Sequence, residues 1–447
     1  MIRMHISEAA WLLGADYSGP DGVFQGCGID SRVLPTGALF VALPGQHRDG
    51  HDFVNFSADQ GAAAAMVERS GVHYPLPTID VDDCHHALGQ LASIWRKRFR
   101  CQLVAVTGSN GKTTVKELLA AILGKLGPTH ATQGNLNNDL GVPLTLLGLS
   151  RRHRWAVVEM GANHPNEITA LARIARPTIG VITQCAPAHL EGFGDIGSVA
   201  KAKGELLAGL GRTGIAIINA DDPYADLWRN LAGDRRLMTF GLDNPADVSA
   251  DYQLELDRVK LTLKTPFGHQ DAQIALPGRH NVLNALAATA AAIAAGCSLE
   301  IIAKGLMSAG KINGRLQVKY AQNGSRIIDD TYNANPGSLM AALKVLANYG
   351  DPRWLVLGDM GELGDEGPEL HEQVGIVARE SGVTRLFAMG TLSRYTVNAF
   401  GSGGYHYTDS ASLLSAMRTE LPQETTVLVK GSRHMQMEKV VNELLTW

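Results

Sequence analysis

Short apolar runs that alternate with helix-like segments dominate the chain after residue 102. The first four runs are rich in β-branched residues, and most are separated by stretches of helical periodicity: LVAVTG (103–108), WAVVEMG (155–161), TIGVITQ (178–184) and GIAIINADD (214–222). Strands joined by crossover helices produce this pattern. The sequence therefore predicts a parallel sheet in the middle of the chain.

A second alternating series follows residue 311 and has the same character. Its runs are SRIIDDTYNANP (325–336), RWLVLGDMG (353–361), RLFAMG (385–390) and TTVLVKGS (425–432). Between the two series, residues 255–278 indicate a hairpin pair, and an Ala-rich helix is expected from about His280. The second series predicts another doubly wound, Rossmann-like module.

The first hundred residues have a different pattern. Segment 30–53 is dense in turn formers between short predicted strands, and 90–100 is expected to be a helix that leads out of this module. A chain of 447 residues is too long for one ordinary core. We expect an α/β fold of three domains: a mixed N-terminal domain at 1–100, a central parallel-sheet domain at 101–311 and a Rossmann-like C-terminal domain at 312–447.

Composition narrows the class of protein. Hydrophobic residues make up 45% of the chain and charged residues 19%, as in a globular protein. The net charge of −4 offers no general surface for a polyanion, so nucleic acid is not an expected partner. Five dispersed cysteines without a CxxC pair indicate reduced thiols and a cytoplasmic location. No signal-peptide core is present and the Ala-rich segment 284–296 is too short to cross a bilayer, so membrane insertion is not expected.

The first apolar run ends in a loop suited to phosphate. A standard P-loop has four residues between its first Gly and the Gly-Lys pair, and Val106 stands where that Gly belongs. The chain has a shortened form instead, in which glycines still let backbone N–H groups converge on an anion at a helix N-terminus. Its residues are Thr107, Gly108, Ser109, Asn110, Gly111, Lys112, Thr113 and Thr114.

This loop predicts a bound nucleoside triphosphate. Lys112 is expected to bridge the outer phosphates of ATP, and the Thr113 hydroxyl to hold Mg²⁺. The alternative is a glycine-rich turn with a solvated lysine, but the order of strand, loop and amphipathic helix disfavours it. The central domain is therefore expected to be P-loop ATPase-like.

Other candidates lie near the ends of predicted strands, where α/β sheets bind ligands. Glu159 ends the second run and is suited to Mg²⁺ or, equally, to a helix cap or turn. His189 lies in the loop after the third run, where histidines are more often structural or solvated. Lys203 lies in VAKAKGELL, a predicted helix on which a lysine usually faces solvent.

Two further groups follow the central domain. Arg315, in INGRL, could bring a positive charge to phosphate. Segment 330–336 offers an acid, an aromatic ring and amides at a strand end, which suits a nucleoside. Neither group is specific by itself, and the residues alone indicate an ATP-using α/β enzyme that needs Mg²⁺.

In combination these motifs resemble the Mur ligases, the ATP-dependent amide-forming enzymes of peptidoglycan assembly. The family pattern is a TGxNGKT loop, a Glu closing the next strand, a loop His, a lysine in an AKxxL-like helix, HNxxNAxAA, a Gly-Arg and a later Asp. This chain has the same order over essentially its whole length: Thr107 to Thr114, Glu159, His189, Lys203, HNVLNALAA (280–288), Arg315 and Asp330.

The resemblance implies a role for each matching position. The catalytic residues it implies are Lys112, His189, Lys203 and Arg315. ATP is implied to contact the loop from Gly108 to Thr114 together with Asn284, Arg315, Asp330, Tyr332 and Asn335. Two Mg²⁺ ions are implied at Thr113, Glu159, His189 and Lys203, with Lys203 as a carbamate formed with CO₂. Candidate contacts of the uridine nucleotide precursor are Ser31, Arg32, Asn137 and Asn138.

Within the family, four segments indicate the substrates. VVEMGANHPNEI, APAHLEGFG, DDTYNANP and LVKGSRHMQMEKV are most similar to the member that adds D-alanyl-D-alanine to UDP-N-acetylmuramoyl-tripeptide through an acyl phosphate. The resemblance thus implies these two molecules as partners of a cytoplasmic enzyme, which we expect to be a monomer. The N-terminal domain would bind the precursor and the C-terminal domain the dipeptide.

Two features depart from the family pattern. Gln184-Cys185-Ala186 occupies places where Asn-Ile or Asn-Val usually precedes the histidine loop, which affects the expected metal-site geometry. DNPA at 243–246 resembles the DNPR motif by which a sibling enzyme grips its amino acid. It lies in the central domain and lacks the arginine, so we interpret it as coincidence.

Three other functions compete with this interpretation. Another ligase of the superfamily, of the folylpolyglutamate synthase type, is disfavoured by the muramoyl-type N-terminal segment and by DDTYNANP. A P-loop kinase or ATPase would transfer or hydrolyse phosphate and form no amide. A nucleotide-binding regulatory protein would have lost the candidate catalytic residues, which are all present in this chain.

Overall fold

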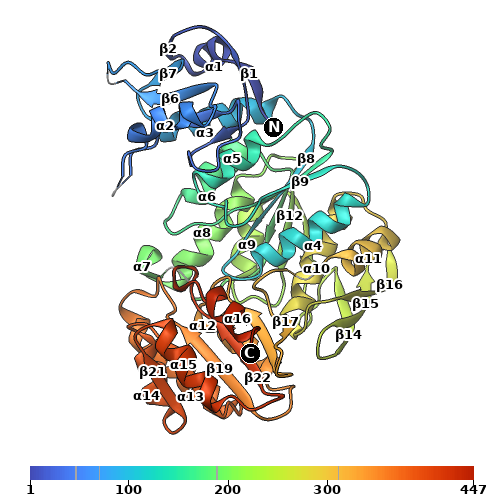
Figure 1. Ribbon diagram of the computed structural model, residues 1–447. Helices are drawn as coiled ribbons and strands as arrows, with labels where there is room; N and C mark the ends of the chain where they lie inside the picture. The colour runs from blue at the N-terminus through green and yellow to red at the C-terminus, as the bar shows by residue number, and fades with distance from the viewer. Residues whose placement is uncertain (46–47, 70, 188–189, 311) are drawn as a thin grey trace.

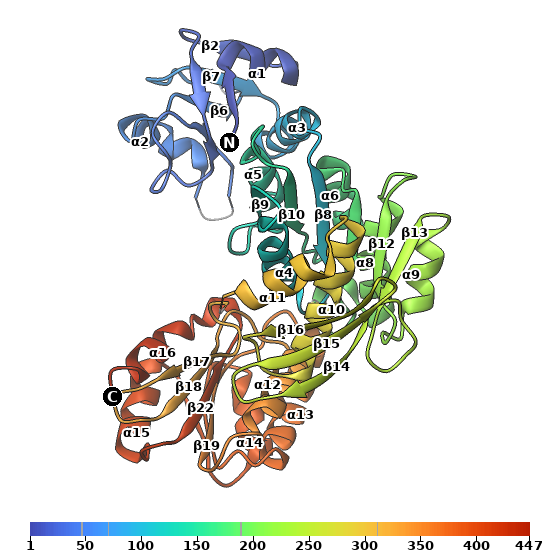
Figure 2. The same ribbon diagram turned by 90° about the vertical axis from the view of Figure 1, so that its right-hand side faces the viewer.

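Three α/β domains are stacked along the long axis of the molecule, with the N-terminal domain at the top of Figure 1 and the C-terminal domain at the bottom. The computed structural model describes residues 1–447 apart from 46–47, 70, 188–189 and 311. The same order of layers is visible after a quarter turn (Figure 2). This arrangement confirms the predicted fold class.

The N-terminal domain combines a mixed five-stranded sheet, in the order β2-β7-β6-β5-β4, with a small antiparallel pair, β1-β3. Its strands are β1 (Arg3–His5), β2 (Asp16–Ser18), β3 (Val23–Gln25), β4 (Cys27–Gly28), β5 (Leu39–Val41), β6 (Ala64–Glu68) and β7 (Thr78–Val81). Its helices are α1 (Ile6–Leu13), α2 (Val54–Asp59) and α3 (Cys84–Lys97). As predicted, the last of these helices leads into the central domain.

The central domain has a six-stranded parallel sheet in the order β13-β12-β11-β8-β10-β9. The strands are β8 (Gln102–Thr107), β9 (Thr129–Ala131), β10 (Trp155–Glu159), β11 (Ile179–Ile182), β12 (Ile215–Asn219) and β13 (Arg236–Phe240). The helices are α4 (Lys112–Gly124), α5 (Gly141–Leu147), α6 (Glu167–Ala175), α7 (Leu190–Phe193), α8 (Ile196–Ala208), α9 (Ala225–Ala232), α10 (Arg279–Ala294) and α11 (Leu299–Ser308).

A three-stranded antiparallel sheet lies beside this domain, where the sequence predicted only a hairpin pair. The hairpin is β15 (Val259–Thr265) with β16 (Gly268–Ile274), and β14 (Ser249–Leu254) adds a strand upstream of the predicted segment. Most residues of β14 are polar or exposed, so the strand lacks the alternation that would have indicated it.

The C-terminal domain repeats the parallel design, with a six-stranded sheet in the order β17-β18-β22-β19-β20-β21 and one antiparallel edge. Its strands are β17 (Gln317–Tyr320), β18 (Arg326–Asp330), β19 (Arg353–Gly358), β20 (Arg385–Met389), β21 (Gly404–Tyr407) and β22 (Thr426–Lys430). The helices are α12 (Pro336–Leu346), α13 (Gly367–Glu380), α14 (Ser393–Phe400), α15 (Ser410–Glu420) and α16 (Glu438–Leu444).

Alternation along the central strands decides which core each side chain joins. Val104 and Val106 of β8 pack with α4, α10 and α11 on one face of the sheet. Leu103 and Ala105 point to the other face and join a cluster that also contains α3 and the N-terminal sheet. The C-terminal domain has its own apolar clusters on both faces of its sheet. In the described part of the chain, no helix combines the length and apolar character needed to cross a membrane.

Candidate active site

The loop between β8 and α4 has the conformation that the phosphate-loop pattern predicts. Gly108 and Gly111 have φ values of 142° and 84°, which favour glycine. A Cβ at Gly108 would lie 1.9 Å from the Thr183 hydroxyl, and one at Gly111 would lie 2.3 Å from the Asn284 side-chain oxygen. Both glycines are therefore required by close packing as well as by φ.

Lys112 lies over this loop and its charge is held in place there. Its Nζ donates to the carbonyl oxygens of Gly108 at 2.7 Å and Ser109 at 3.3 Å. Burial lowers the pKa of Lys112, while Glu159 acts in the opposite direction and Arg315 adds to the lowering. The ammonium thus stands where an incoming phosphate could replace the two carbonyl partners.

The C-terminal domain contributes groups to the same loop. Arg315 donates from Nη2 to the Thr113 hydroxyl at 3.2 Å, and its guanidinium lies 4.2 Å from the centre of the Tyr332 ring. Asn335 donates from its side chain to the Asn110 side-chain oxygen at 2.8 Å. These contacts bring together residues that are more than two hundred positions apart in the chain.

Glu159 has one carboxylate oxygen without a hydrogen-bond partner among the described residues, and it lines the cavity beside the phosphate loop. It ends β10 and is 1% exposed. Its Oε1 accepts from the Asn137 side-chain nitrogen at 2.7 Å, whereas Oε2 is buried without a hydrogen-bond partner among the described residues. A carboxylate oxygen and the Thr113 hydroxyl, which line one cavity, are ligands suited to Mg²⁺. The cap or turn alternative for Glu159 is not what the structure shows, because the side chain faces this cavity.

Lys203 is buried, so the alternative of a solvent-facing lysine on α8 is not what the structure shows. The side chain is 1% exposed. Its Nζ donates to the Ala162 carbonyl at 3.3 Å and lies 5.4 Å from the Phe193 ring centre. Burial, and next the charge of Lys112, lower the pKa of Lys203 to about 7. No carboxylate is bonded to this amine among the residues that the structure describes. His189 lies outside the described residues.

The departure at Gln184-Cys185-Ala186 supports the phosphate loop through its backbone. Ser109 donates its N–H to the Gln184 carbonyl at 2.8 Å and its hydroxyl to the Ala186 carbonyl at 2.9 Å. The Cys185 N–H donates to Asp222 at 2.6 Å, and burial raises the pKa of the Cys185 thiol to about 12. Because the contacts to the loop are made by the main chain, they do not depend on the unusual side chains.

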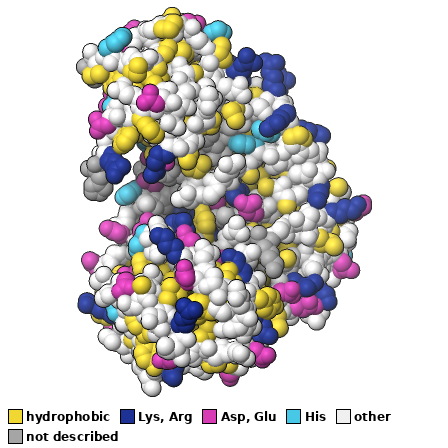
Figure 3. All heavy atoms as spheres, viewed as in Figure 1, with side chains coloured by type: hydrophobic (Ala, Val, Ile, Leu, Met, Phe, Trp, Pro, Cys, Tyr) yellow, Lys and Arg dark blue, Asp and Glu magenta, His cyan; other side chains and the backbone are white. Residues whose placement is uncertain are grey.

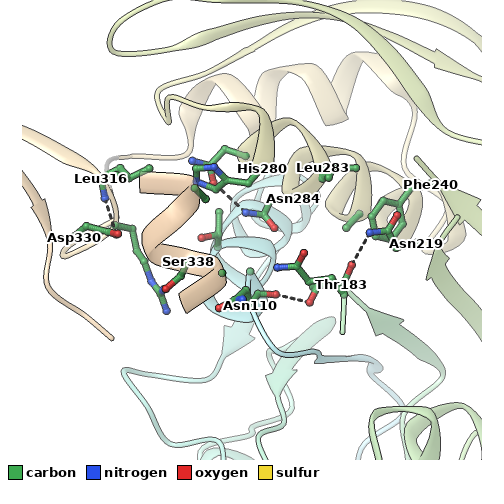
Figure 4. Close-up of a pocket in the computed structure, with 18 of the residues that line it drawn as sticks. Asn110, Thr183, Asn219, Phe240, His280, Leu283, Asn284, Leu316, Asp330 and Ser338 are labelled. Carbon is green, nitrogen blue, oxygen red and sulfur yellow. Dashed lines mark hydrogen bonds between the residues drawn. The ribbon is translucent and has the colours of Figure 1, made fainter. Parts of the chain in front are cut away.

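A small pocket of about 90 Å³ lies on one side of the phosphate loop (Figure 4). Asn284 and His280 of α10 face it from above, Asn110 from the loop and Asp330 from β18. Burial lowers the pKa of His280 to about 4, so this imidazole is neutral at pH 7. The wall combines neutral amide and imidazole groups with the charged side chains of Arg315, Asp330 and Lys430. A polar pocket of this kind beside a phosphate loop suits the base and sugar of a nucleotide.

A larger cavity of about 510 Å³ lies on the other side of the loop and contacts all three domains. Its lining includes Lys112, Thr113 and Glu159 of the central domain, together with Glu362 and Arg433 of the C-terminal domain. Figure 3 shows this face hollowed between the upper and lower domains, with Lys and Arg side chains at the edges of the hollow. The cavity can therefore hold a second, larger substrate beside the triphosphate.

Comparisons with known proteins agree with this geometry. Three family models match along the chain: the Mur ligase family catalytic domain at 23–96, the Mur ligase middle domain at 106–292 and the Mur ligase glutamate ligase domain at 314–433. The UDP-N-acetylmuramoyl-tripeptide–D-alanyl-D-alanine ligase of Escherichia coli K12 is 41% identical, over 99% of both chains.

The chain belongs to the Mur ligase family.

Solved structures of Mur ligases have the same fold. MurF from Acinetobacter baumannii is 34% identical, with a TM-score of 0.92 over 100% of this chain and 99% of the other. MurF ligase from Thermotoga maritima, solved in complex with ADP, is 26% identical with a TM-score of 0.81, over 94% and 97% of the two chains. The predicted family is thereby confirmed.

Two of the four residues predicted to bind the precursor line the large cavity. These are Asn137 and Asn138. Ser31 is buried, and Arg32 is exposed and forms a salt bridge with Asp30 at 2.6 Å. Neither is among the described residues that line the cavity, to which the N-terminal domain contributes Ile29. A binding role for Ser31 and Arg32 stays a prediction.

Sequence reasoning missed two buried lysines near the site. Lys430 ends β22 and donates to the Asp330 carboxylate at 2.6 Å and to the Asn333 carbonyl at 2.8 Å. Asp330, predicted as a nucleotide contact, is thus also half of a buried ion pair. Lys116 of α4 is equally buried. The signal in the sequence is a lysine at the end of an apolar strand for Lys430, and a lysine on the apolar face of a helix for Lys116.

Proposed function

We propose that this chain is an ATP-dependent, ADP-forming ligase that joins the terminal carboxylate of UDP-N-acetylmuramoyl-tripeptide to the amine of D-alanyl-D-alanine. The observation that carries the proposal is the 510 Å³ cavity, in which a phosphate loop, an unpaired carboxylate oxygen and side chains of the C-terminal domain meet. Full-length similarity to a ligase of that name supports the choice of substrates.

The chemistry requires two anions to approach each other. The carboxylate oxygen of the precursor attacks the γ-phosphorus of ATP, the bond to the β-phosphate oxygen breaks, and ADP leaves. The amine of the dipeptide then attacks the acyl phosphate, loses a proton, and phosphate leaves from a tetrahedral intermediate. Lys112, Arg315 and the amides of the phosphate loop supply positive charge that lowers the repulsion between the reacting anions.

Magnesium fits the donors present. The Thr113 hydroxyl and the free Oε2 of Glu159 would hold it, and the bound ion would neutralise developing charge on the phosphates. In the described ranges no three His, Cys, Asp or Glu side chains form a closed metal cage. Mg²⁺ usually keeps few protein ligands and shares substrate phosphates, so this open donor set suits it.

We infer that Lys203 carries a carbamate in the active enzyme, with one CO₂ added to Nζ and one proton released. The buried amine lacks a carboxylate partner among the described residues, and its lowered pKa leaves it largely neutral near pH 8, the form that attacks CO₂. The product would be an oxygen ligand for a second Mg²⁺.

We further propose a division of labour among the domains. The N-terminal domain, 1–100, binds the uridine nucleotide of the precursor, the central domain, 101–311, binds ATP, and the C-terminal domain, 312–447, binds the dipeptide. Arg433, which also pairs with Glu438 at 2.9 Å, and Glu362 support this assignment, because both line the cavity and their charges complement the two charged ends of a dipeptide. The free state of all five cysteines supports a cytoplasmic location.

The decisive experiment is incubation with ATP, Mg²⁺, the tripeptide precursor and D-alanyl-D-alanine, followed by mass spectrometry of the product. We expect ADP to appear in step with the pentapeptide. A folylpolyglutamate synthase type of ligase would use glutamate in place of the dipeptide. An ATPase that forms no amide would release ADP at the same rate without it, and either result would reject the proposal.

A further inference from the structure

Lys116 is a buried cation that the proposed chemistry leaves unused. It lies one turn beyond Lys112 on α4 and is 1% exposed. Its Nζ donates to the Thr132 carbonyl at 2.8 Å and to Glu117 at 2.5 Å. An apolar side chain of similar volume would fill this space without the cost of removing a charge from water. The ammonium therefore calls for an explanation beyond stability.

Thr132 is the partner through which Lys116 reaches the site. It follows β9, and its N–H donates to the Val157 carbonyl at 3.0 Å. Its hydroxyl accepts the N–H of Glu159 at 3.0 Å. Thr132 is thus hydrogen-bonded to α4 through its carbonyl and to β10 through its amide and hydroxyl. The hydroxyl bond is made to the main chain of Glu159, whose side chain has the oxygen without a partner among the described residues.

Segment 132–138, which begins at Thr132, also contacts Glu159 near its C-terminal end. Asn137 donates from its side chain to Glu159 Oε1 at 2.7 Å, and its carbonyl accepts the N–H of Gly161 at 2.8 Å. Asn137 and Asn138 line the large cavity. No described residue of 132–138 lines the small pocket that we assign to the base and sugar of the nucleotide. Fixing Thr132 therefore fixes the start of a segment that serves the precursor side of the site.

We propose that Lys116 is a positioning residue for the precursor and metal side of the active site, acting through Thr132 on segment 132–138 and on Glu159. This inference rests on the proposed function. The Lys116 ammonium pairs with Glu117 and donates to the Thr132 carbonyl. Lys116 therefore acts by holding Thr132 in position, and not through an electrostatic interaction with the substrates. Loss of Lys116 should weaken binding of the precursor and Mg²⁺ and leave ATP binding nearly unchanged.

The test compares Lys116→Met, which keeps the length of the side chain, with Lys116→Arg, which keeps its donors. Lys125→Met, at the exposed end of the same helix, is the matched control. Steady-state kinetics of the full chain should give a KM for the precursor and an Mg²⁺ half-saturation about tenfold higher for Lys116→Met, with the KM for ATP within about twofold of wild type. Lys116→Arg should recover part of the loss. Equal increases in both KM values, or no increase, would overturn the inference.

Hydrogen exchange of the ligand-free protein, read by mass spectrometry, gives a second measurement that needs no activity. Amides of 132–138 should exchange faster in Lys116→Met, while those of 108–114 and 326–330 should not change. If Lys116→Met does not fold, Thr132→Val removes only the hydroxyl that holds the Glu159 N–H, and the same kinetic split is expected. Unchanged exchange in 132–138 would refute the positioning role even if the wild-type chain formed a different product, so failure of this inference and failure of the proposed function are distinguishable.

Discussion

Lys203 and Lys430 are both about 1% exposed beside a parallel sheet, yet their surroundings are opposite. Lys430 in the C-terminal domain is bonded to the Asp330 carboxylate and to a carbonyl, and Asp330 opposes the lowering of its pKa by burial. Lys203 in the central domain has one long hydrogen bond to a carbonyl. Equal burial thus accompanies a paired cation in one domain and an amine without a carboxylate partner among the described residues in the other, which is the contrast that the proposed role of Lys203 requires.

Removing the amine of Lys203 should have the largest effect on activity. We expect Lys203→Ala to lower kcat by about 10³-fold, as for loss of a group that acts at the reacting atoms, and short carboxylic acids to restore part of it. Amide formation measured with and without acetate tests this. Lys201→Ala, exposed on the same helix, is the control. Full activity of Lys203→Ala without acetate would contradict the carbamate role.

Removing Lys430 should have the largest effect on stability. Lys430→Met leaves Asp330 buried and unpaired, which we expect to lower the free energy of unfolding by about 3–5 kcal/mol. Lys203→Met removes a cation without a carboxylate partner, so it should leave stability unchanged or raise it. Urea unfolding of the two variants and of Lys430→Met combined with Asp330→Asn measures the contrast. Equal losses of unfolding free energy in Lys430→Met and Lys203→Met would show that the carboxylate partner does not distinguish the two lysines.

Glu159 tests whether the large cavity, at whose edge Lys203 bonds the Ala162 carbonyl, contains a metal site. Glu159→Gln keeps an acceptor for Asn137 but loses the negative charge of the free oxygen. We expect the Mg²⁺ concentration for half-maximal rate to rise by at least about tenfold at saturating ATP. A rate curve that does not move along the Mg²⁺ axis would place the metal elsewhere.

His280 should give an effect that is small at pH 7 and grows as the pH falls. It lies beside the Lys430–Asp330 pair, and its pKa is lowered from 6.5 to about 4 in the folded protein. Between these values the unfolded chain binds a proton that the folded chain does not, so stability falls as pH falls. His280→Gln should lose less stability than wild type between pH 6.5 and pH 4, as measured by thermal unfolding. Parallel pH profiles of the two proteins would argue against a neutral His280.

The sequence predicted the order of strands and helices and the phosphate loop well, because these depend on local pattern. The sequence also indicates the burial of Lys203, because the lysine shares one face of α8 with three apolar residues, Val199, Leu206 and Leu207. The pairing of Lys430 with Asp330 joins residues 100 positions apart. No local pattern gives such a contact, and the same holds for the Arg315–Thr113 bond.

The polar seam between the central and C-terminal domains has a mechanical consequence. Arg315–Thr113, Asn335–Asn110 and the Tyr349 hydroxyl on the Leu256 carbonyl are hydrogen bonds, whereas the N-terminal domain shares an apolar core with the central sheet. Hydrogen bonds can be exchanged for water at little net expense, but a shared core cannot be parted without exposing it. Moving the C-terminal domain away from the central domain would therefore cost less free energy than parting the N-terminal domain from the central sheet.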